Sequence, residues 1–201
     1  MKAVFFDVGE TLVDETRWWG EHARRIGVSP LVLADTLEMT IERGEDHRAV
    51  WGHLGHPVAA EDEEIGYVAA DLYPDAQQCL ADLRADGYFV AVAGNQGIGL
   101  ERDLRGFGLD VDRVTSSVGL GARKPASEFF ERLVAQTDFL PGECGYVGDR
   151  VDFDVRPARA AGLVAIHIQR GPWGRLQHGS EEANLRVESL AELPTALRSL
   201  A

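Results

Sequence analysis

The sequence contains very little lysine and cysteine. Only Lys2 and Lys124 are lysines among its 20 basic residues. A chain that uses arginine almost everywhere and keeps a lysine at position 124 indicates a need for a compact ammonium group there, although a bias in composition would give the same pattern. Cys79 and Cys144 form no metal-binding spacing, so we expect two reduced, buried thiols in a cytoplasmic protein.

The chain also lacks long apolar runs and a surplus of positive charge. Since no run is long enough to span a bilayer and no signal-peptide pattern opens the chain, the sequence predicts no membrane partner. The formal net charge of −13 argues against nucleic acid as a partner. The 201 residues, 45% hydrophobic and 26% charged, suffice for one core domain with a modest insertion. We expect a monomer or a homodimer.

The stretch that organises the chain is residues 3–12, AVFFDVGETL. Four apolar residues run directly into Asp7, a glycine and a hydroxyl residue. A short continuous apolar run that ends at a turn signal is typical of a strand buried on both faces of a parallel sheet. Asp7 would then lie near the carboxyl end of that strand, where open α/β sheets bind their ligands.

The segment after this strand is predicted to be helical. Ser29 and Pro30 give one helix a capping residue and a proline at its first position. Helices are expected at residues 16–26, 31–43, 46–54 and 61–72. The pattern predicts a small all-helical cap of residues 15–73 inserted after the first strand. The core domain would consist of residues 1–14 and 74–201.

From position 73 onward, strands and helices alternate regularly. Buried strands are expected at residues 88–93, 113–117, 145–147 and 163–168, with helices at residues 75–85, 97–104, 126–136, 150–161 and 190–200. Residues 169–184 are polar and contain several glycines, so we expect a loop there. This alternation predicts an α/β fold whose core is a three-layer, Rossmann-like parallel sheet with right-handed crossovers.

The residues suited to chemistry all fall where a strand ends. They occur in four segments, which are Asp7 to Leu12, Gly94-Asn95, Lys124-Pro125 and Gly148-Asp149 with Asp154. In this order and placement they resemble the four signatures of the haloacid dehalogenase-like (HAD) hydrolase superfamily. The resemblance covers the full chain, and the cap position is similar to the helical type of that family.

The resemblance implies a role for each of these residues. Asp7 would be the nucleophile that forms an aspartyl-phosphate. Asp7, the backbone carbonyl of Gly9 and Asp149 would hold Mg²⁺ through hard oxygen ligands. Lys124 would neutralise the nucleophile and the phosphoryl oxygens, so its replacement is predicted to abolish phosphate binding at little cost in stability. The remaining roles fall to three residues: Gly94 and Asn95 would contribute to phosphoryl binding, and Asp154 would orient Lys124 or a metal-bound water.

Each residue also has an ordinary structural explanation. Lys124 could be a solvated surface residue, Asn95 a turn residue, and Asp149 an acid that offsets a helix dipole; the last explanation also applies to Asp154. These explanations fit the residues singly but not their shared placement. The cap tryptophans Trp18, Trp19 and Trp51 are expected to serve packing rather than substrate stacking, and the cap histidines show no metal-ligand spacing.

Three departures from the family pattern bear on activity. Gly9 stands where the phosphatases carry a second aspartate as acid/base, Gly94 replaces a hydroxyl residue, and Phe153 replaces an asparagine. Glu10 should point away from Asp7 in an extended strand and is a poor substitute for the missing acid. Because acid/base catalysis is worth about 10²–10⁴-fold, Gly9→Asp is predicted to raise alkyl phosphate turnover by such a factor.

The resemblance favours a Mg²⁺-dependent phosphatase that acts on a small phosphorylated metabolite. A 2-haloacid dehalogenase is an alternative, because that branch also lacks the second aspartate; it does without a metal and without the Gly-Asp signature. Phosphonatase chemistry is excluded, since it needs a cap lysine and residues 14–73 contain none. A catalytically degenerate member that binds a phosphorylated ligand or a protein remains a further alternative.

Overall fold

A single parallel sheet forms the centre of the molecule. The computed structural model describes residues 1–56 and 65–200. In these residues six strands pair in the order β3-β2-β1-β4-β5-β6. The strands are β1 (Ala3–Phe6), β2 (Phe89–Gly94), β3 (Arg113–Ser116), β4 (Cys144–Gly148), β5 (Val164–Ile168) and β6 (Leu185–Val187). Every pairing is parallel.

The first strand occupies the middle of the sheet. Ala3 of β1 pairs with Phe89 of β2 on one side and with Cys144 of β4 on the other. All four residues of β1 are buried, as expected for a strand covered on both faces. Lys2, immediately before β1, keeps a side chain that is 58% exposed and pairs with Glu143 at 2.8 Å.

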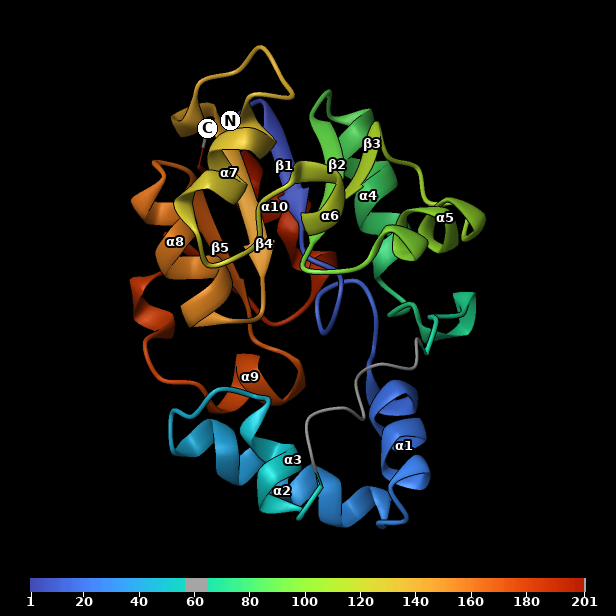
Figure 1. The fold of residues 1–201 in the computed structure, drawn as a ribbon. Coiled ribbons are helices and arrows are strands. Elements are labelled where there is room, and N and C mark those ends of the chain that lie inside the picture. The colour runs from blue at the N-terminus through green and yellow to red at the C-terminus, as the bar shows by residue number, and fades with distance from the viewer. Residues whose placement is uncertain (57–64, 201) are drawn as a thin grey trace.

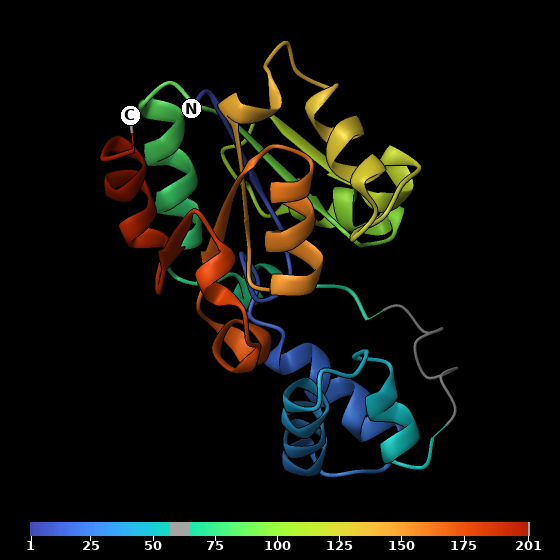
Figure 2. The ribbon, with the colours of Figure 1, turned by 90° about the vertical axis from the view of Figure 1, so that its left-hand side faces the viewer.

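Helices cover both faces of the sheet (Figure 2). One hydrophobic cluster joins the sheet to α4 (Ala76–Ala85), α5 (Ile98–Gly106) and α10 (Leu193–Arg198). A second cluster joins the other face to α6 (Ser117–Leu120), α7 (Ser127–Val134) and α8 (Arg156–Ala160). The predicted three-layer α/β fold with a parallel sheet is therefore confirmed.

Three helices lie beyond the carboxyl edge of the strands, in the lower part of Figure 1. They are α1 (Thr16–Arg25), α2 (Pro30–Glu42) and α3 (Ala49–His53). The Ser29 hydroxyl accepts the Leu31 N–H at 3.2 Å, which caps α2 as its sequence predicts. These helices bury a cluster of their own, to which α9 (Gly171–Leu176) contributes Trp173. The predicted cap and its boundaries, residues 15–73, stay a prediction.

The chain leaves the sheet for these helices after Leu12 and returns to it near Tyr73, and these two chain crossings run side by side. Asp14 N–H donates to the Asp71 carbonyl at 2.8 Å, and Tyr73 N–H donates to the Leu12 carbonyl at 2.9 Å. Arg17 reinforces the pairing through two hydrogen bonds to the Asp71 carboxylate, at 2.8 and 2.6 Å. The crossings therefore hold each other in place.

Several local predictions were wrong. The helix expected at 61–72 does not form at 65–68, and only Ala69–Asp71 makes a short 3₁₀ turn; positions 61–64 lie outside the described residues. The expected loop at 169–184 contains α9 and a 3₁₀ turn (Ser180–Glu182). The three-residue strand β6 was missed because so short a segment shows no alternation. No helix among the described residues has the length and apolar character needed to cross a membrane.

Candidate active site

The carboxyl ends of β1 and β4 lie next to each other, and an aspartate comes directly after each strand. Asp7 follows β1, and its N–H donates to the Val147 carbonyl at 2.9 Å. Asp149 follows β4 directly. The strand order reverses at this point, because β2 and β3 lie on one side of β1 and β4, β5 and β6 lie on the other. Open α/β sheets form their ligand crevice where the order reverses.

Lys124 is buried between two carboxylates. Its side chain is 3% exposed, and Nζ lies 2.8 Å from Asp7 Oδ1 and 2.6 Å from Asp154 Oδ1. Nζ also lies 5.3 Å from the centre of the Tyr146 ring. Burial opposes the charge, but Asp154 and Asp7 hold the pKa of Lys124 well above its usual value. Lys124 is therefore not a surface residue.

Asn95 fixes the main chain at Lys124. Asn95 Oδ1 accepts the Lys124 N–H at 2.8 Å, and Asn95 Nδ2 donates to the Lys124 carbonyl at 2.9 Å. Both ends of the amide are used in this way. The structure thus shows Asn95 as a residue that positions the lysine, and its predicted contact with a phosphoryl group stays a prediction.

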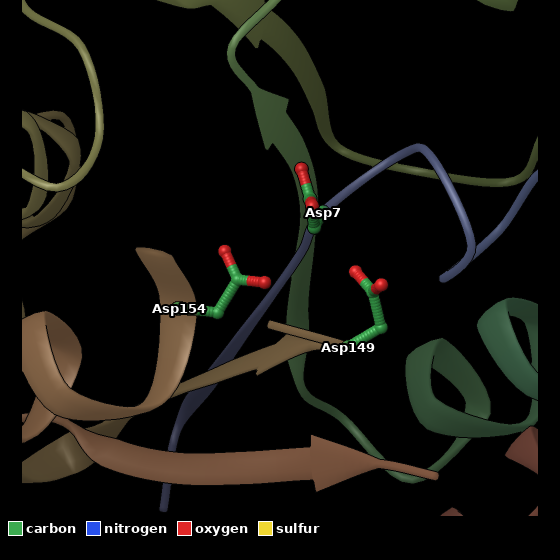
Figure 3. A group of neighbouring side chains, drawn as sticks. All are labelled: Asp7, Asp149 and Asp154. Atoms are coloured by element: carbon green, nitrogen blue, oxygen red, sulfur yellow. The ribbon is translucent and has the colours of Figure 1, made fainter. Parts of the chain in front are cut away.

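Asp7, Asp149 and Asp154 form one acidic cluster (Figure 3). One carboxylate oxygen from each lies within 4.8 Å of the others. Asp154 is 1% exposed, and its Oδ2 accepts the Arg150 N–H at 2.9 Å. Burial, together with the charges of Asp154 and Asp7, raises the pKa of Asp149 well above its usual value. Burial also raises the pKa of Asp154 to about 6, against the effect of Lys124.

The cluster fits a divalent cation. It offers three hard carboxylate oxygens, the ligand type that Mg²⁺ and Ca²⁺ select. Within residues 1–56 and 65–200, no side chain donates a hydrogen bond to the Asp149 carboxylate. A charge that is 2% exposed and lacks a donor is costly unless a cation neutralises it. Gly9, whose carbonyl is the other predicted ligand, lines the same cavity.

Gly94, the last residue of β2, leaves room for the Asp7 side chain. A Cβ atom at residue 94 would lie 2.7 Å from Asp7 Oδ1 and would also overlap the Gln96 side chain. The hydroxyl residue of the family pattern would therefore need Asp7 to move. The glycine at position 94 thus allows Asp7 Oδ1 to lie where the structure places it.

Gly9 is also crowded, and the crowding group is the carboxyl of Glu15. A Cβ atom at residue 9 would lie 2.7 Å from Glu15 Cδ and 3.2 Å from Glu15 Oε2. The Tyr67 hydroxyl donates to Glu15 Oε1. Burial and the neighbouring charge of Glu10 raise the pKa of Glu15 to about 8. No sequence pattern pointed to Glu15.

Glu10, the substitute acid considered from the sequence, is hydrogen-bonded to the chain crossings. It adopts a left-handed backbone conformation with φ of 51°. Its carboxylate accepts the Tyr73 hydroxyl at 2.6 Å and the Glu15 N–H at 3.2 Å. Both bonds go to residues of the two chain crossings, so Glu10 braces the connection to the helices.

A cavity of about 410 Å³ opens over Asp7, Lys124 and Asp149. Its outer wall is aromatic and consists mainly of Trp18, Trp19, His47, Phe153 and Trp173. The Arg150 guanidinium lies 4.0 Å from the centre of the Phe153 ring and 5.0 Å from that of Trp173. Trp51 is buried in the small helical cluster and Trp19 packs against it, as predicted. Trp18 and Trp19 also line the cavity.

Comparison with known proteins gives this arrangement a family. A family model described as haloacid dehalogenase-like hydrolase matches residues 1–162. The chain belongs to the haloacid dehalogenase-like hydrolase family. The sequence prediction of a HAD-like hydrolase is confirmed, and the chain is an enzyme of that class.

Relatives of this hydrolase include named phosphatases. It is 26% identical over 231 residues to a glyceraldehyde 3-phosphate phosphatase of Methanopyrus kandleri, covering 100% of this chain and 99% of that one. It is 34% identical over 127 residues to a phosphoserine phosphatase of Thermus thermophilus, covering 61% and 49% of the two chains. Its fold matches that of the L-2-haloacid dehalogenase of Xanthobacter autotrophicus with a TM-score of 0.70, 20% identity and full coverage of both chains.

The raised pKa of Glu15 predicts a pH effect on the stability of this hydrolase. A carboxyl whose pKa is about 8 when folded and 4.5 when unfolded holds its proton longer in the native state. Stability from this group is therefore present at low pH and lost as pH rises toward 8, with a slope of up to about 1.4 kcal/mol per pH unit. Glu15→Gln does not titrate, so its free energy of unfolding should rise relative to that of the unmodified protein between pH 5 and pH 8. Urea unfolding in EDTA across this range checks the prediction, and parallel curves would contradict it.

Proposed function

We propose that this hydrolase is a Mg²⁺-dependent phosphatase of small phosphorylated metabolites, working through an aspartyl-phosphate at Asp7. The observation that carries the proposal is the placement of Lys124 Nζ, 2.8 Å from Asp7 Oδ1, next to the buried carboxylate of Asp149. An anionic ester can approach an aspartate nucleophile only if cations neutralise both groups. The phosphatase names of its relatives support the same substrate class.

The reaction begins with Asp7. Its carboxylate oxygen attacks phosphorus, the bond from phosphorus to the ester oxygen breaks, and the electron pair leaves with that oxygen. Lys124 holds its positive charge against Asp7 and the phosphoryl oxygens throughout. Bound Mg²⁺, held by Asp7, Asp149 and the Gly9 carbonyl, would supply further charge neutralisation. Water then attacks the phosphorus of the aspartyl-phosphate and releases inorganic phosphate.

A substrate panel tests the proposal. Phosphate release from p-nitrophenyl phosphate, phosphoserine and glyceraldehyde 3-phosphate is measured with Mg²⁺ and with EDTA, and chloride release is measured from 2-chloropropionate. We expect Mg²⁺-dependent phosphate release and no chloride release. Chloride release that is insensitive to EDTA would instead establish a dehalogenase, the second candidate, which the glycine at position 9 favours. Ligand binding without any turnover would establish a non-catalytic member.

Asp149 is expected to carry much of the cation affinity. Asp149→Asn removes a charged oxygen ligand from the cluster, so calorimetric titration should show Mg²⁺ affinity reduced by at least about 10–100-fold, the range seen even for residues that only support metal ligands. Asp152→Asn is the matched control. Asp152 pairs with Arg150 at 2.7 Å outside the cluster, so its Mg²⁺ affinity should be unchanged. Equal affinities in the two variants would remove Asp149 from the metal site.

A further inference from the structure

The site contains a carboxyl group that the family pattern does not place there. Glu15 reaches back from the residue before α1 and fills the space beside Gly9. Its Cδ lies 2.7 Å from where a Cβ at position 9 would stand, and its Oε2 lies 3.2 Å from that point. A side chain at position 9 would therefore occupy the same volume as the Glu15 carboxyl.

Three contacts hold Glu15 in this position. Its N–H donates to Glu10 Oε1 at 3.2 Å, and its carbonyl accepts the Trp19 N–H at 2.8 Å in the first turn of α1. The Tyr67 hydroxyl, from the returning chain crossing, donates to Oε1. Because Oε1 accepts that hydrogen bond, a proton on this carboxyl belongs on Oε2.

Glu15 also faces the reacting groups. It lines the cavity together with Asp7, Lys124 and Asp149. A leaving oxygen that departs in line from Asp7 must emerge in this cavity. The Glu15 carboxyl therefore lies in the cavity where the leaving oxygen needs a proton.

We propose that Glu15 is the proton donor to the leaving group, taking the place of the side chain that position 9 lacks. The inference rests on the proposed phosphatase function. As the bond from phosphorus to the ester oxygen breaks, the electron pair stays on that oxygen and takes the proton from Glu15 Oε2, so that an alcohol departs. The Glu15 carboxylate then takes a proton from the water that attacks the aspartyl-phosphate, and the group returns to its starting state.

The position of Glu15 changes what a substitution at Gly9 should do. The sequence alone predicts that Gly9→Asp raises the turnover of alkyl phosphates. In the structure the new side chain would displace the Glu15 carboxyl, so Gly9→Asp alone should exchange one acid for another and bring little gain. Gly9→Asp combined with Glu15→Ala frees the volume and moves a carboxyl to the residue where the family has one.

Leaving-group dependence is the test. An aryl phosphate such as p-nitrophenyl phosphate leaves with little need of a proton, whereas an alkyl phosphate such as phosphoserine requires one. Glu15→Gln should lower turnover of phosphoserine about 10²–10⁴-fold and that of p-nitrophenyl phosphate less than about tenfold. The double variant Gly9→Asp/Glu15→Ala should recover phosphoserine turnover relative to Glu15→Ala. Glu21→Gln, on the outer side of α1 and paired with Arg24, is the control and should match the unmodified enzyme on both esters.

The outcomes separate the inference from the function on which it rests. If the unmodified enzyme hydrolyses neither ester, the proposed function is wrong and the inference falls with it. If the enzyme is active and Glu15→Gln leaves the ratio of the two rates unchanged, Glu15 is not the donor. An equal loss on both esters, with no recovery in the double variant, would likewise overturn the inference, since it would show a purely structural role.

Discussion

Asp7→Asn is expected to lower phosphate ester hydrolysis by about 10⁴–10⁶-fold, the scale seen when a covalent nucleophile is removed. The amide has the shape of the carboxylate but cannot attack phosphorus to form an acyl-phosphate. Initial rates with p-nitrophenyl phosphate and Mg²⁺ measure the effect. The fold should survive, because one of three crowded carboxylates is neutralised. In EDTA the variant should melt at or above the temperature of the unmodified protein.

An exposed aspartate provides the comparison. Asp86 pairs with Arg198 at the surface, away from the cavity, so Asp86→Asn should keep full activity. Residual hydrolysis by Asp7→Asn within tenfold of the unmodified rate would mean that another group attacks phosphorus. It would remove the covalent mechanism while leaving the family assignment intact.

Lys124→Met should abolish inhibition by vanadate and also destabilise the protein strongly. The sequence suggested a charge held for function at little cost in stability. The structure shows an ammonium that is 3% exposed and serves two carboxylates, Asp7 and Asp154. Removing one partner of a buried ion pair leaves uncompensated charge and typically costs about 3–5 kcal/mol. Urea unfolding and vanadate inhibition of p-nitrophenyl phosphate hydrolysis measure the two effects.

Lys2→Met is the control for the loss of an ammonium group. Its pair with Glu143 lies at the surface, where ion pairs contribute about 0–1 kcal/mol. Its stability and vanadate inhibition should remain near those of the unmodified protein. If Lys124→Met were still inhibited by vanadate at the original concentration, the ammonium would play no part in binding the phosphoryl group.

The fold could be predicted from the sequence because its main signals are local. An apolar run ending at Asp7, and others ending near Asn95 and Asp149, fix both a buried parallel sheet and the edge where the polar side chains meet. The position of Lys124 at that edge rested on the family resemblance, because α6 separates Lys124 from the end of β3. Short elements such as α6 and β6 carry too few residues for a periodic pattern.

The role open to Glu15 could not be predicted, because it depends on how the chain turns after the first strand. The search for a replacement acid considered Glu10, one residue after Gly9. Its left-handed backbone accompanies a hydrogen bond from Tyr73 to that side chain, while the carboxyl of Glu15, five residues further on, lies beside Gly9. The approach of the Glu15 carboxyl to Gly9 has no signature in composition or spacing. It can be seen only once the three-dimensional positions of both chain crossings are known.

The scarcity of lysine and the burial of Lys124 have a practical consequence for chemical modification. Amine-reactive reagents attack exposed, neutral amines, and Lys124 is enclosed and held charged by two carboxylates. Lys2, at the opposite end of β1 from Asp7, carries the other ammonium side chain of the sequence and is open to solvent. Amine-directed immobilisation would therefore attach the folded enzyme through Lys2 rather than Lys124, and would leave the carboxyl edge of the sheet, with Asp7, facing away from the support.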